Sequence, residues 1–338
     1  MRSTRKTRRN SFLGNTACVL LVALVLPFTA QAEMGDSYVH KGNEYYHEQQ
    51  WDKAIEQYQL AIKINPEHLG ALHNLGIAYQ SKRDFAKAIT TFQKIKKLDK
   101  LYVPAYISMG LIYAQKGLYK KAQAEYVRAV ILEPDNLVAH LNLSAILAKQ
   151  GFYVKALRAA RRGLAIAPAS PHLHLLIANV YFIKQKYALA KLEYLKALKL
   201  QPETPGARMM LALSMAHLGQ FEGALTQMDI VKSLDIHPVE IARNKGKILA
   251  LRFYKEKVGW KEAVDALKFA ASQSGDDPEI YKELGDLMRA MSQVSEARKW
   301  YKRVLAGKTS SIADKTKVET IMKSWPKSEK RANVSSKL

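Results

Sequence analysis

The stretch Val103–Asn136, VPAYISMGLIYAQKGLYKKAQAEYVRAVILEPDN, decides the fold because it contains two short apolar faces at helical spacing. The first face comprises Tyr106, Met109, Gly110 and Tyr113. The second follows the turn at Lys116-Gly117, and it comprises Tyr119, Ala122, Tyr126 and Ala129, with Pro134 closing the unit. Two short helices cannot bury both faces by themselves. The unit therefore needs neighbours stacked against it.

The same unit recurs at intervals of 34 residues on both sides of this stretch. Its copies begin at Gly35, Leu69, Val103, Leu137, Pro171, Pro205, Val239 and Pro278. A five-residue insertion around residues 254–258 separates the last two, and we expect it to lengthen the turn or the first helix there. Each first helix has a small residue near its middle, at Gly42, Gly76, Gly110, Ser144, Ala178, Ala212, Gly246 and Gly285. These small residues predict that the two helices of each unit cross closely.

This pattern resembles the tetratricopeptide repeat family, which is built from helix-turn-helix units of 34 residues. The resemblance implies an all-α solenoid of about eight repeats over residues 33–311, wound as a right-handed superhelix with the first helices lining a concave groove. Two departures are local. Lys100 stands where the second repeat should have its proline, and Ala160 replaces the second-helix aromatic residue of the fourth.

The two ends of the chain differ from the repeats. Residues 312–326 predict a capping helix, and residues 327–338 predict a basic disordered tail. Residues 1–32 predict a signal peptide, because a cationic start precedes an apolar run and then Ala30-Gln31-Ala32, a small-x-small cleavage site.

Cleavage between Ala32 and Glu33 would release an exported bacterial protein into the periplasm. The alternative is an uncleaved segment that anchors the chain in the inner membrane, although its apolar run is shorter than the roughly 20 residues a spanning helix needs. The single cysteine, Cys18, lies in this segment, so the mature chain would have no thiol for a disulfide or a metal site.

The chain is strongly basic, with 53 Lys and Arg against 30 Asp and Glu and a formal charge of +23. Removal of residues 1–32, which carry five cations and no acid, leaves +18. This excess points to acidic partners or to an anionic surface. A nucleic-acid partner is not favoured, because export would separate the protein from it and no base-stacking platform is evident.

The resemblance implies that a partner segment binds in the groove of the first helices. The residues expected to face this groove are Asn43, Tyr46, His47, His73, Asn74, Ile107, Leu111, Leu141, Asn142, Leu175, Asn179, Phe182, Met209, Leu213, Arg243 and Lys247. These residues predict a groove that is polar in the first repeats, largely apolar in the middle repeats and basic in the later ones. An apolar groove favours docking of a protein or peptide segment, and the alternative is cover by the protein's own tail or by a second copy in a homo-oligomer.

One branch of the family grips a peptide's terminal carboxylate with two asparagines and three basic residues. Asn43 and Asn74 fall on the asparagine positions, but Val39, Pro104 and Ser108 occupy the basic ones. A carboxylate without these cations loses its charge-assisted hydrogen bonds. The clamp is therefore absent.

Basic residues recur at two positions of the second helices and predict two ladders on the outer face. These residues are Lys53, Lys87, Lys121 and Lys155 at one position and Lys94, Arg128, Arg162 and Lys196 at the other. They are suited to anionic lipid headgroups, lipopolysaccharide or an acidic protein. The alternative is a solvated helix face, since lysine at the position of Lys53 is ordinary in the family.

The sequence contains no recognisable catalytic constellation, so it predicts a protein that is not an enzyme. It has no nucleophile elbow, phosphate-binding loop or paired-carboxylate motif. No cofactor is expected. His40, His47 and His73 could approach one another, but no carboxylate completes a metal site at a recognisable spacing.

The function predicted from these observations is that of a scaffold or adaptor. It would dock a partner segment in its groove during envelope assembly, secretion or polysaccharide export, which is a step by family analogy. The alternative is a scaffold tethered to the inner membrane, whose basic outer face binds anionic lipid or polysaccharide.

Overall fold

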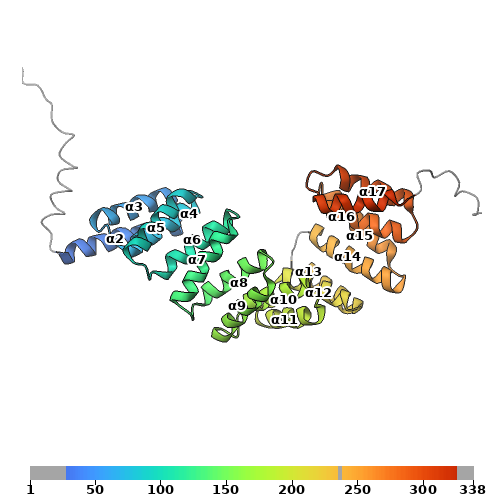
Figure 1. The fold of residues 1–338 in the computed structure, drawn as a ribbon, viewed down its shortest axis with the longest axis horizontal. Coiled ribbons are helices and arrows are strands. Elements are labelled where there is room, and N and C mark those ends of the chain that lie inside the picture. The colour runs from blue at the N-terminus through green and yellow to red at the C-terminus, as the bar shows by residue number, and fades with distance from the viewer. Residues whose placement is uncertain (1–27, 235–237, 326–338) are drawn as a thin grey trace, which may run out of the picture. The chain divides into compact units, whose positions relative to one another are not determined.

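The computed structural model describes residues 28–234 and 238–325 and is all-α over them, which confirms the expected fold class (Figure 1). The first helices of the repeats are α2 (Phe28–His47), α4 (Leu69–Ser81), α6 (Val103–Gln115), α8 (Leu137–Lys149), α10 (Pro171–Ile183), α12 (Pro205–His217), α14 (Pro238–Glu256) and α16 (Pro278–Ala290). The second helices are α3 (Trp51–Ile64), α5 (Phe85–Leu98), α7 (Tyr119–Leu132), α9 (Tyr153–Ile166), α11 (Tyr187–Leu200), α13 (Phe221–Lys232), α15 (Trp260–Gln273) and α17 (Val294–Ala306). A last helix, α18 (Ile312–Lys323), follows them.

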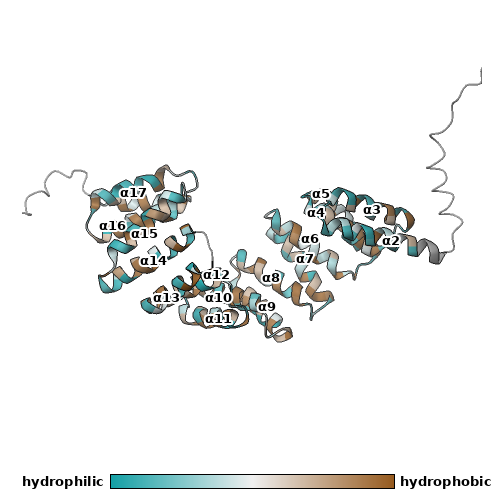
Figure 2. Ribbon diagram, turned by 180° about the vertical axis from the view of Figure 1, so that it is seen from behind, coloured by the Kyte–Doolittle hydropathy of each residue, from teal (hydrophilic) through white to brown (hydrophobic). Residues whose placement is uncertain are grey.

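The chain divides into two compact units, Met1–Ala167 with α2–α9 and Pro168–Leu338 with α10–α18. Within each unit, every helix packs against the next one along the chain (Figure 1). Hydrophobic and hydrophilic residues alternate over short intervals around these helices, as expected of helices buried on one side (Figure 2). The expected leader up to residue 27 and the basic tail lie outside the described residues, while α2 begins at Phe28 and so includes the expected cleavage position.

The small residues of the first helices make room for large side chains of the second helices. A Cβ atom at Gly110 would lie only 2.5 Å from Cε1 of Tyr126, which is fully packed at 2% exposure. The same overlap would arise between Gly42 and Tyr58 and between Gly285 and Tyr301. In these repeats an aromatic ring of the second helix therefore lies directly against a glycine of the first helix.

Three buried tyrosines of the second helices, Tyr58, Tyr194 and Tyr301, also satisfy their hydroxyl groups across the helix pair. Tyr58 donates to Oδ1 of Asn43 at 2.8 Å, Tyr194 to Oδ1 of Asn179 at 2.6 Å and Tyr301 to Oδ1 of Asp286 at 2.6 Å. Burial raises the pKa of Tyr58 to about 12, with a smaller contribution from Tyr46. The hydrogen bonds remove the cost of burying a phenol without a partner.

A residue with left-handed backbone recurs in the turn between the two helices of a repeat. The residues are Gln49, Arg83, Gly117, Gly151, Gln185, Gly219 and Ser292. Glycine adopts this conformation without strain, whereas an L side chain costs about 1–2 kcal/mol there. These seven turns therefore share one backbone conformation whether or not glycine occupies the position, whereas the turn of the seventh repeat has left-handed residues at Lys257 and Gly259 instead.

The last repeats contain the two irregular helices. Helix α14 has 19 residues where most first helices have 13, so the insertion lengthens the first helix. Helix α18 is capped by Ser311, whose Oγ accepts a hydrogen bond from the backbone N–H of Asp314 at 3.0 Å. Over residues 28–234 and 238–325, no helix has both the length and the apolarity that crossing a membrane requires.

Candidate functional site

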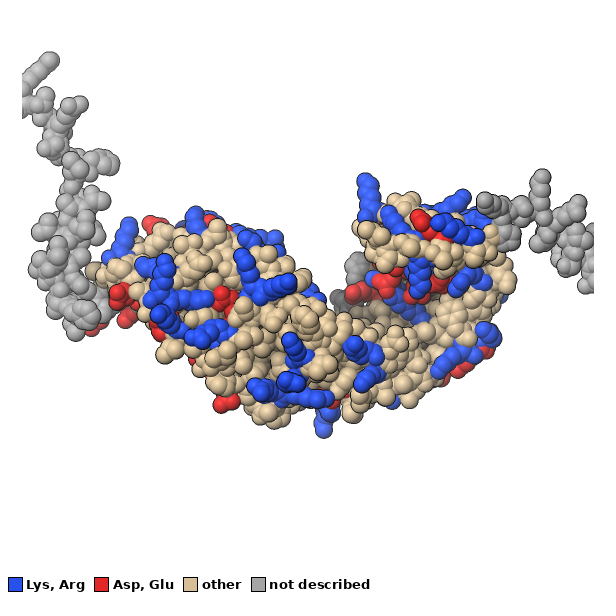
Figure 3. Space-filling model, viewed as in Figure 1, with Lys and Arg blue, Asp and Glu red and all other residues tan. Residues whose placement is uncertain are grey.

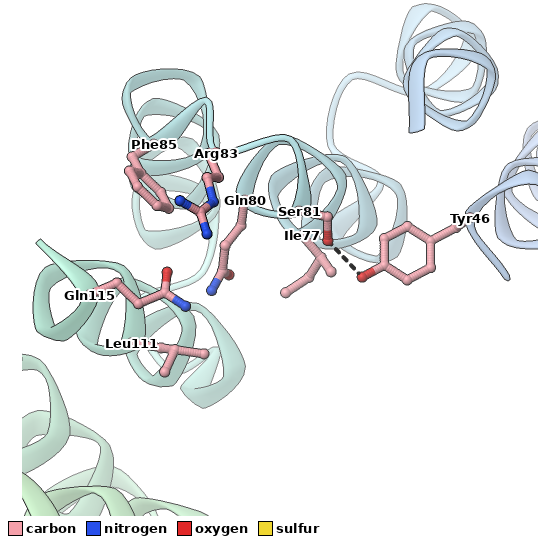
Figure 4. Close-up of a pocket in the computed structure, with 8 residues that line it drawn as sticks. All are labelled: Tyr46, Ile77, Gln80, Ser81, Arg83, Phe85, Leu111 and Gln115. Carbon is pink, nitrogen blue, oxygen red and sulfur yellow. Dashed lines mark hydrogen bonds between the residues drawn. The ribbon is translucent and has the colours of Figure 1, made fainter. Parts of the chain in front are cut away.

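A concave hollow of about 670 Å³ lies on the first helices of the N-terminal unit (Figure 4). Its lining residues are Tyr46 of α2, Ile77, Gln80 and Ser81 of α4, Leu111 and Gln115 of α6, Arg83 of the turn after α4, and Phe85 at the start of α5. Helices α2, α4 and α6 contact one another in turn, so their outward faces form one continuous surface. We call this site the α2–α4–α6 hollow.

The hollow has an apolar part on its first helices. Leu111 is 41% exposed, and Ile77 lies half-buried one repeat earlier at the same position. An exposed leucine beside a partly covered isoleucine can receive one apolar side chain of a ligand.

Polar groups converge on another part of the hollow. The side-chain ends of Gln80, Arg83 and Gln115 point toward one region, while Tyr46 hydrogen-bonds Ser81 Oγ at 2.9 Å at the other side (Figure 4). The Oε1 atom of Gln80 is buried and has no hydrogen-bond partner among the described residues. Arg83 is exposed and forms no ion pair with any described residue. These groups can donate to and accept from a peptide backbone, and they can donate to a carboxylate.

Arg83 also occupies the left-handed turn position, with φ at +62°. Three other repeats have glycine at that place, which avoids the steric cost. In the N-terminal unit the turn nearest the hollow thus accepts strain and displays a cation at its edge. Strained residues of this kind cluster at binding sites.

Of the groove residues predicted for the N-terminal unit, Tyr46 and Leu111 line the hollow. Asn43 and Asn74 are bonded to each other, since Asn74 Nδ2 donates to Asn43 Oδ1 at 2.8 Å, and Tyr58 uses the same acceptor. The remaining predicted residues are His47, which is exposed, and the half-buried His73, Ile107, Leu141 and Asn142. The two asparagines therefore support the repeat itself.

Most of the lining was missed because the prediction did not follow two of its own positions, those of Asn43 and His47, into the next repeats. Ile77 and Leu111 share the position of Asn43, and Ser81 and Gln115 share that of His47. Following those two positions through all repeats would have found four of the lining residues. Arg83 carries no such signal, since its place follows from the turn conformation.

In the C-terminal unit, part of the predicted apolar groove is core. Met209 and Leu213 are only 7% and 8% exposed and pack with Phe221, Met228 and Ile248. The expectation that these two side chains offer a docking surface is wrong, because α13 and α14 cover them. Leu175 and Phe182 are half-buried, and Asn179 is exposed with its Oδ1 bonded to Tyr194.

The expected basic end of the groove is neutralised within the protein. Arg243 and Lys247 of α14 both pair with Glu279 of α16, and Arg243 Nη1 lies 3.5 Å from Oδ2 of Asp277. Burial alone would raise the pKa of Glu279, but the hydrogen bond and charge of Lys247 and the charge of Arg243 outweigh it and lower that pKa. The two cations hold adjacent repeats together and are not free for a ligand.

An aromatic cluster in the C-terminal unit surrounds a titratable ring. His217 stacks on Tyr187 with centroids 4.0 Å apart and planes at 3°, and Phe182 meets both rings edge-on. Burial lowers the pKa of His217, and the positive charge of Lys255 lowers it further. The pKa of His73 in the N-terminal unit is also lowered, because the effect of burial outweighs that of its hydrogen bond with Asn74.

We expect stability to fall on mild acidification because of these histidines. Their folded pKa values lie below the ordinary value near 6.5, so the unfolded chain binds more protons as pH drops through that value. His217→Phe keeps a ring but removes the titration, and it should reduce the slope of unfolding free energy with pH, by at most about 1.4 kcal/mol per pH unit for one proton. Urea unfolding at pH 7.5 and 5.5 measures this slope, with the exposed His172→Phe as control. An unchanged slope in His217→Phe contradicts the assignment.

Glu279 does not contribute to this slope. Because its folded pKa is lowered, the stability that it provides is lost only below about pH 4.5, outside the range from pH 7.5 to 5.5.

The basic residues predicted for the outer face are exposed, all eight of them. Lys53, Lys87 and Lys121 lie over the rings of Tyr45, Tyr79 and Tyr113, at 5.4, 5.4 and 5.7 Å from the ring centroids. This position therefore has a structural role, since each cation packs on an aromatic ring of the same repeat. Lys196 pairs with Glu193 at 2.7 Å, whereas Lys94, Arg128 and Arg162 have no ion pair with a described residue.

Sequence models of one repeat family match most of the solenoid. A model described as "TPR repeat" matches residues 42–82, and models described as "Tetratricopeptide repeat" match residues 71–101, 107–171 and 175–233. The chain belongs to the tetratricopeptide repeat family. Tetratricopeptide repeat proteins are in general protein-interaction scaffolds without enzymatic activity, and their stacked repeats present extended binding surfaces.

Solved tetratricopeptide repeat structures resemble the chain in fold. A tetratricopeptide repeat protein from Parabacteroides merdae superposes with a TM-score of 0.57 over 76% of this chain and 99% of its own, at 15% identity. The structure of Pseudomonas aeruginosa pilF superposes with a TM-score of 0.55, covering 61% of this chain and 94% of its own, at 16% identity. A chain of the APC/C hetero-tetramer Cut9-Hcn1 superposes with a TM-score of 0.58, covering 81% of this chain and 51% of its own, at 17% identity. No curated protein sequence matches the chain.

Proposed function

We propose that this tetratricopeptide repeat protein is a non-enzymatic adaptor that docks an extended segment of a partner protein in the α2–α4–α6 hollow. The observation that carries this proposal is the combination of exposed Leu111 with the unpaired polar groups of Gln80 and Arg83 in one concave place. A hollow of this composition can bind one apolar side chain and one acidic group at the same time.

The geometry defines the kind of segment that fits. An apolar side chain lies against Ile77 and Leu111, the amides of Gln80 and Gln115 bond the main chain, and a carboxylate pairs with Arg83. An extended peptide can present an apolar side chain, free main-chain N–H and C=O groups and a carboxylate within a few residues. Its side chains alternate between two sides, so residues two apart face the same way. The preferred ligand is therefore an extended segment with an apolar residue close to an acidic one.

The proposal places this adaptor in the periplasm, where it serves envelope assembly, secretion or polysaccharide export. The support is the sequence of residues 1–32, with its cationic start, apolar run and cleavage site. The inner membrane is the alternative location if these residues are retained. Sequencing the N-terminus of the protein isolated from its own envelope separates the two, because a start at Glu33 establishes cleavage.

Substitutions in the hollow should weaken binding of selected peptides. A displayed library of random peptides is first selected on the wild-type protein, and we expect enrichment of peptides that pair an apolar residue with an acidic one. Leu111→Lys and Arg83→Glu should each reduce affinity about tenfold or more, the loss typical of a central interface residue. Fluorescence anisotropy with one selected peptide gives the Kd. Peptides that bind both variants as well as the wild type contradict the site.

Arg83→Gly separates binding from stability. Glycine relieves the left-handed strain, so the variant should gain about 1 kcal/mol in unfolding free energy while binding the acidic peptide more weakly. Gln185→Gly is the matched control, because it makes the same change in the C-terminal unit. The control should gain similar stability and keep full affinity.

A second copy of the chain is the competing occupant of the hollow. In that case the wild-type protein would sediment as a dimer and Leu111→Lys would sediment as a monomer. This outcome contradicts the adaptor proposal.

A further inference from the structure

The second helices of the third and fourth repeats form an outer surface with unusual chemistry. Helices α7 and α9 both pack on α8 and turn an exposed set of alternating apolar and cationic side chains outward. We call it the α7–α9 face, and it consists of Val127, Arg128, Ile131, Val154, Arg158 and Arg162. Val154 is 73% exposed and Ile131 is 61% exposed.

The cations of this face have no counter-charge among the described residues. Arg128, Arg158 and Arg162 form no salt bridge or hydrogen bond with any residue that the structure describes. Helix α9, YVKALRAARRGLAI, contains no acidic residue, and the acid within α7, Glu125, is half-buried and pairs with Lys96 at 2.8 Å. Figure 3 shows Lys and Arg gathered over α9. The positive charge of the face is thus directed to the outside.

The apolar residues of α9 lie among the arginines. Val154, Leu157 and Ala165 border a shallow hollow of about 450 Å³ together with Arg158 and Arg162. Such a site has an apolar floor and a cationic rim. It suits a ligand that carries negative charge and hydrocarbon side by side.

We propose that the α7–α9 face binds the surface of an anionic lipid bilayer. Guanidinium groups bond lipid phosphates in pairs of hydrogen bonds, and exposed valine and isoleucine can enter the boundary between headgroups and acyl chains. An acidic protein would also satisfy the arginines. It is the weaker fit, because protruding apolar residues among unpaired cations offer no neutral hydrogen-bonding group that fixes one particular chain.

This surface is separate from the α2–α4–α6 hollow, which is lined mainly by first helices. Binding to a bilayer through second helices therefore leaves the peptide site of the proposed function free. The two proposals can fail independently, since each rests on different residues.

Sedimentation with lipid vesicles tests the proposal. The full chain and the chain cleaved before Glu33 are mixed with phosphatidylcholine vesicles, with and without phosphatidylglycerol. We expect salt-sensitive binding to the anionic vesicles only, and Arg158→Glu with Arg162→Glu should lower the partition coefficient about tenfold or more. Val154→Ser should lower it several-fold and to a greater relative extent at high salt, where the apolar contribution dominates.

The matched control carries the same change in net charge elsewhere. Lys268→Glu with Lys302→Glu alters two exposed lysines of the C-terminal unit and should leave vesicle binding nearly unchanged. Circular dichroism verifies that each variant is folded, as expected for exposed positions. Wild-type binding by the double arginine variant, or an equal loss in the lysine control, overturns the proposal. Displacement from vesicles by soluble polyglutamate, with no effect of Val154→Ser, overturns it in favour of an acidic protein.

Discussion

Replacing Tyr126 by alanine is expected to lower the unfolding free energy of the N-terminal unit by about 3–5 kcal/mol. The ring is 2% exposed and fills the space above Gly110, so its removal leaves a cavity between α6 and α7. Gly110→Ser should cost about 1–3 kcal/mol, because a Cβ atom at 2.5 Å from the ring forces one of the helices to shift.

Combining Tyr126→Ala with Gly110→Ser should lower the unfolding free energy by less than the sum of the two single losses. The fourth repeat already has this combination, with Ser144 and Ala160 both fully buried, so the smaller pair is compatible with the repeat backbone. Urea unfolding gives the free energies, and hydrogen exchange of α6 and α7 locates the effect. Gly206→Ala is the control, since a Cβ atom there meets no atom within 4 Å. Additive costs in the double variant would show that ring and glycine do not act as a pair.

Replacing Val318 by aspartate should detach α18 and destabilise the last repeat by about 3–5 kcal/mol, the cost of an unpaired charge in the core. Val318 is the fully buried residue of α18, and it packs in one cluster with Tyr301 and Val304. Detachment would expose the outer side of α17, which the helix otherwise covers.

The measurement for this prediction is the fluorescence of Trp325 together with hydrogen exchange in α17. Trp325 lies 5.7 Å from the ring of Tyr301, so its emission should shift to the red when α18 leaves. Thr320→Asp is the matched control, because it adds the same charge at an exposed position of the same helix. If the two variants are equally stable, α18 does not serve as a cap.

The fold could be predicted from the sequence because its determinants are local and repeated. Gly110 and Tyr126 recur with the repeat interval, and each repeat needs only its neighbours to bury its faces. The repeat starting points agree with the helix boundaries to within a residue or two beyond the first repeat, as Leu69, Val103 and Leu137 begin α4, α6 and α8.

The binding surfaces were less predictable, because exposure depends on what the neighbouring repeat contributes. Leu111 and Leu213 occupy the same repeat position, yet the first is 41% exposed and the second is 8% exposed. The difference arises because α14, which has 19 residues where most first helices have 13, packs over α12. Likewise Lys247 is cationic in sequence, but Glu279 of the next repeat neutralises it.

The recurring left-handed turn gives the protein one exchangeable side chain in each of seven repeats. Glycine, glutamine, arginine and serine all occupy this position on the same backbone path. A single substitution there can change the charge at the mouth of a ligand site without moving any helix. New ligand preferences could therefore evolve, or be engineered, at the turns while the interlocked helix pairs beneath them stay as they are.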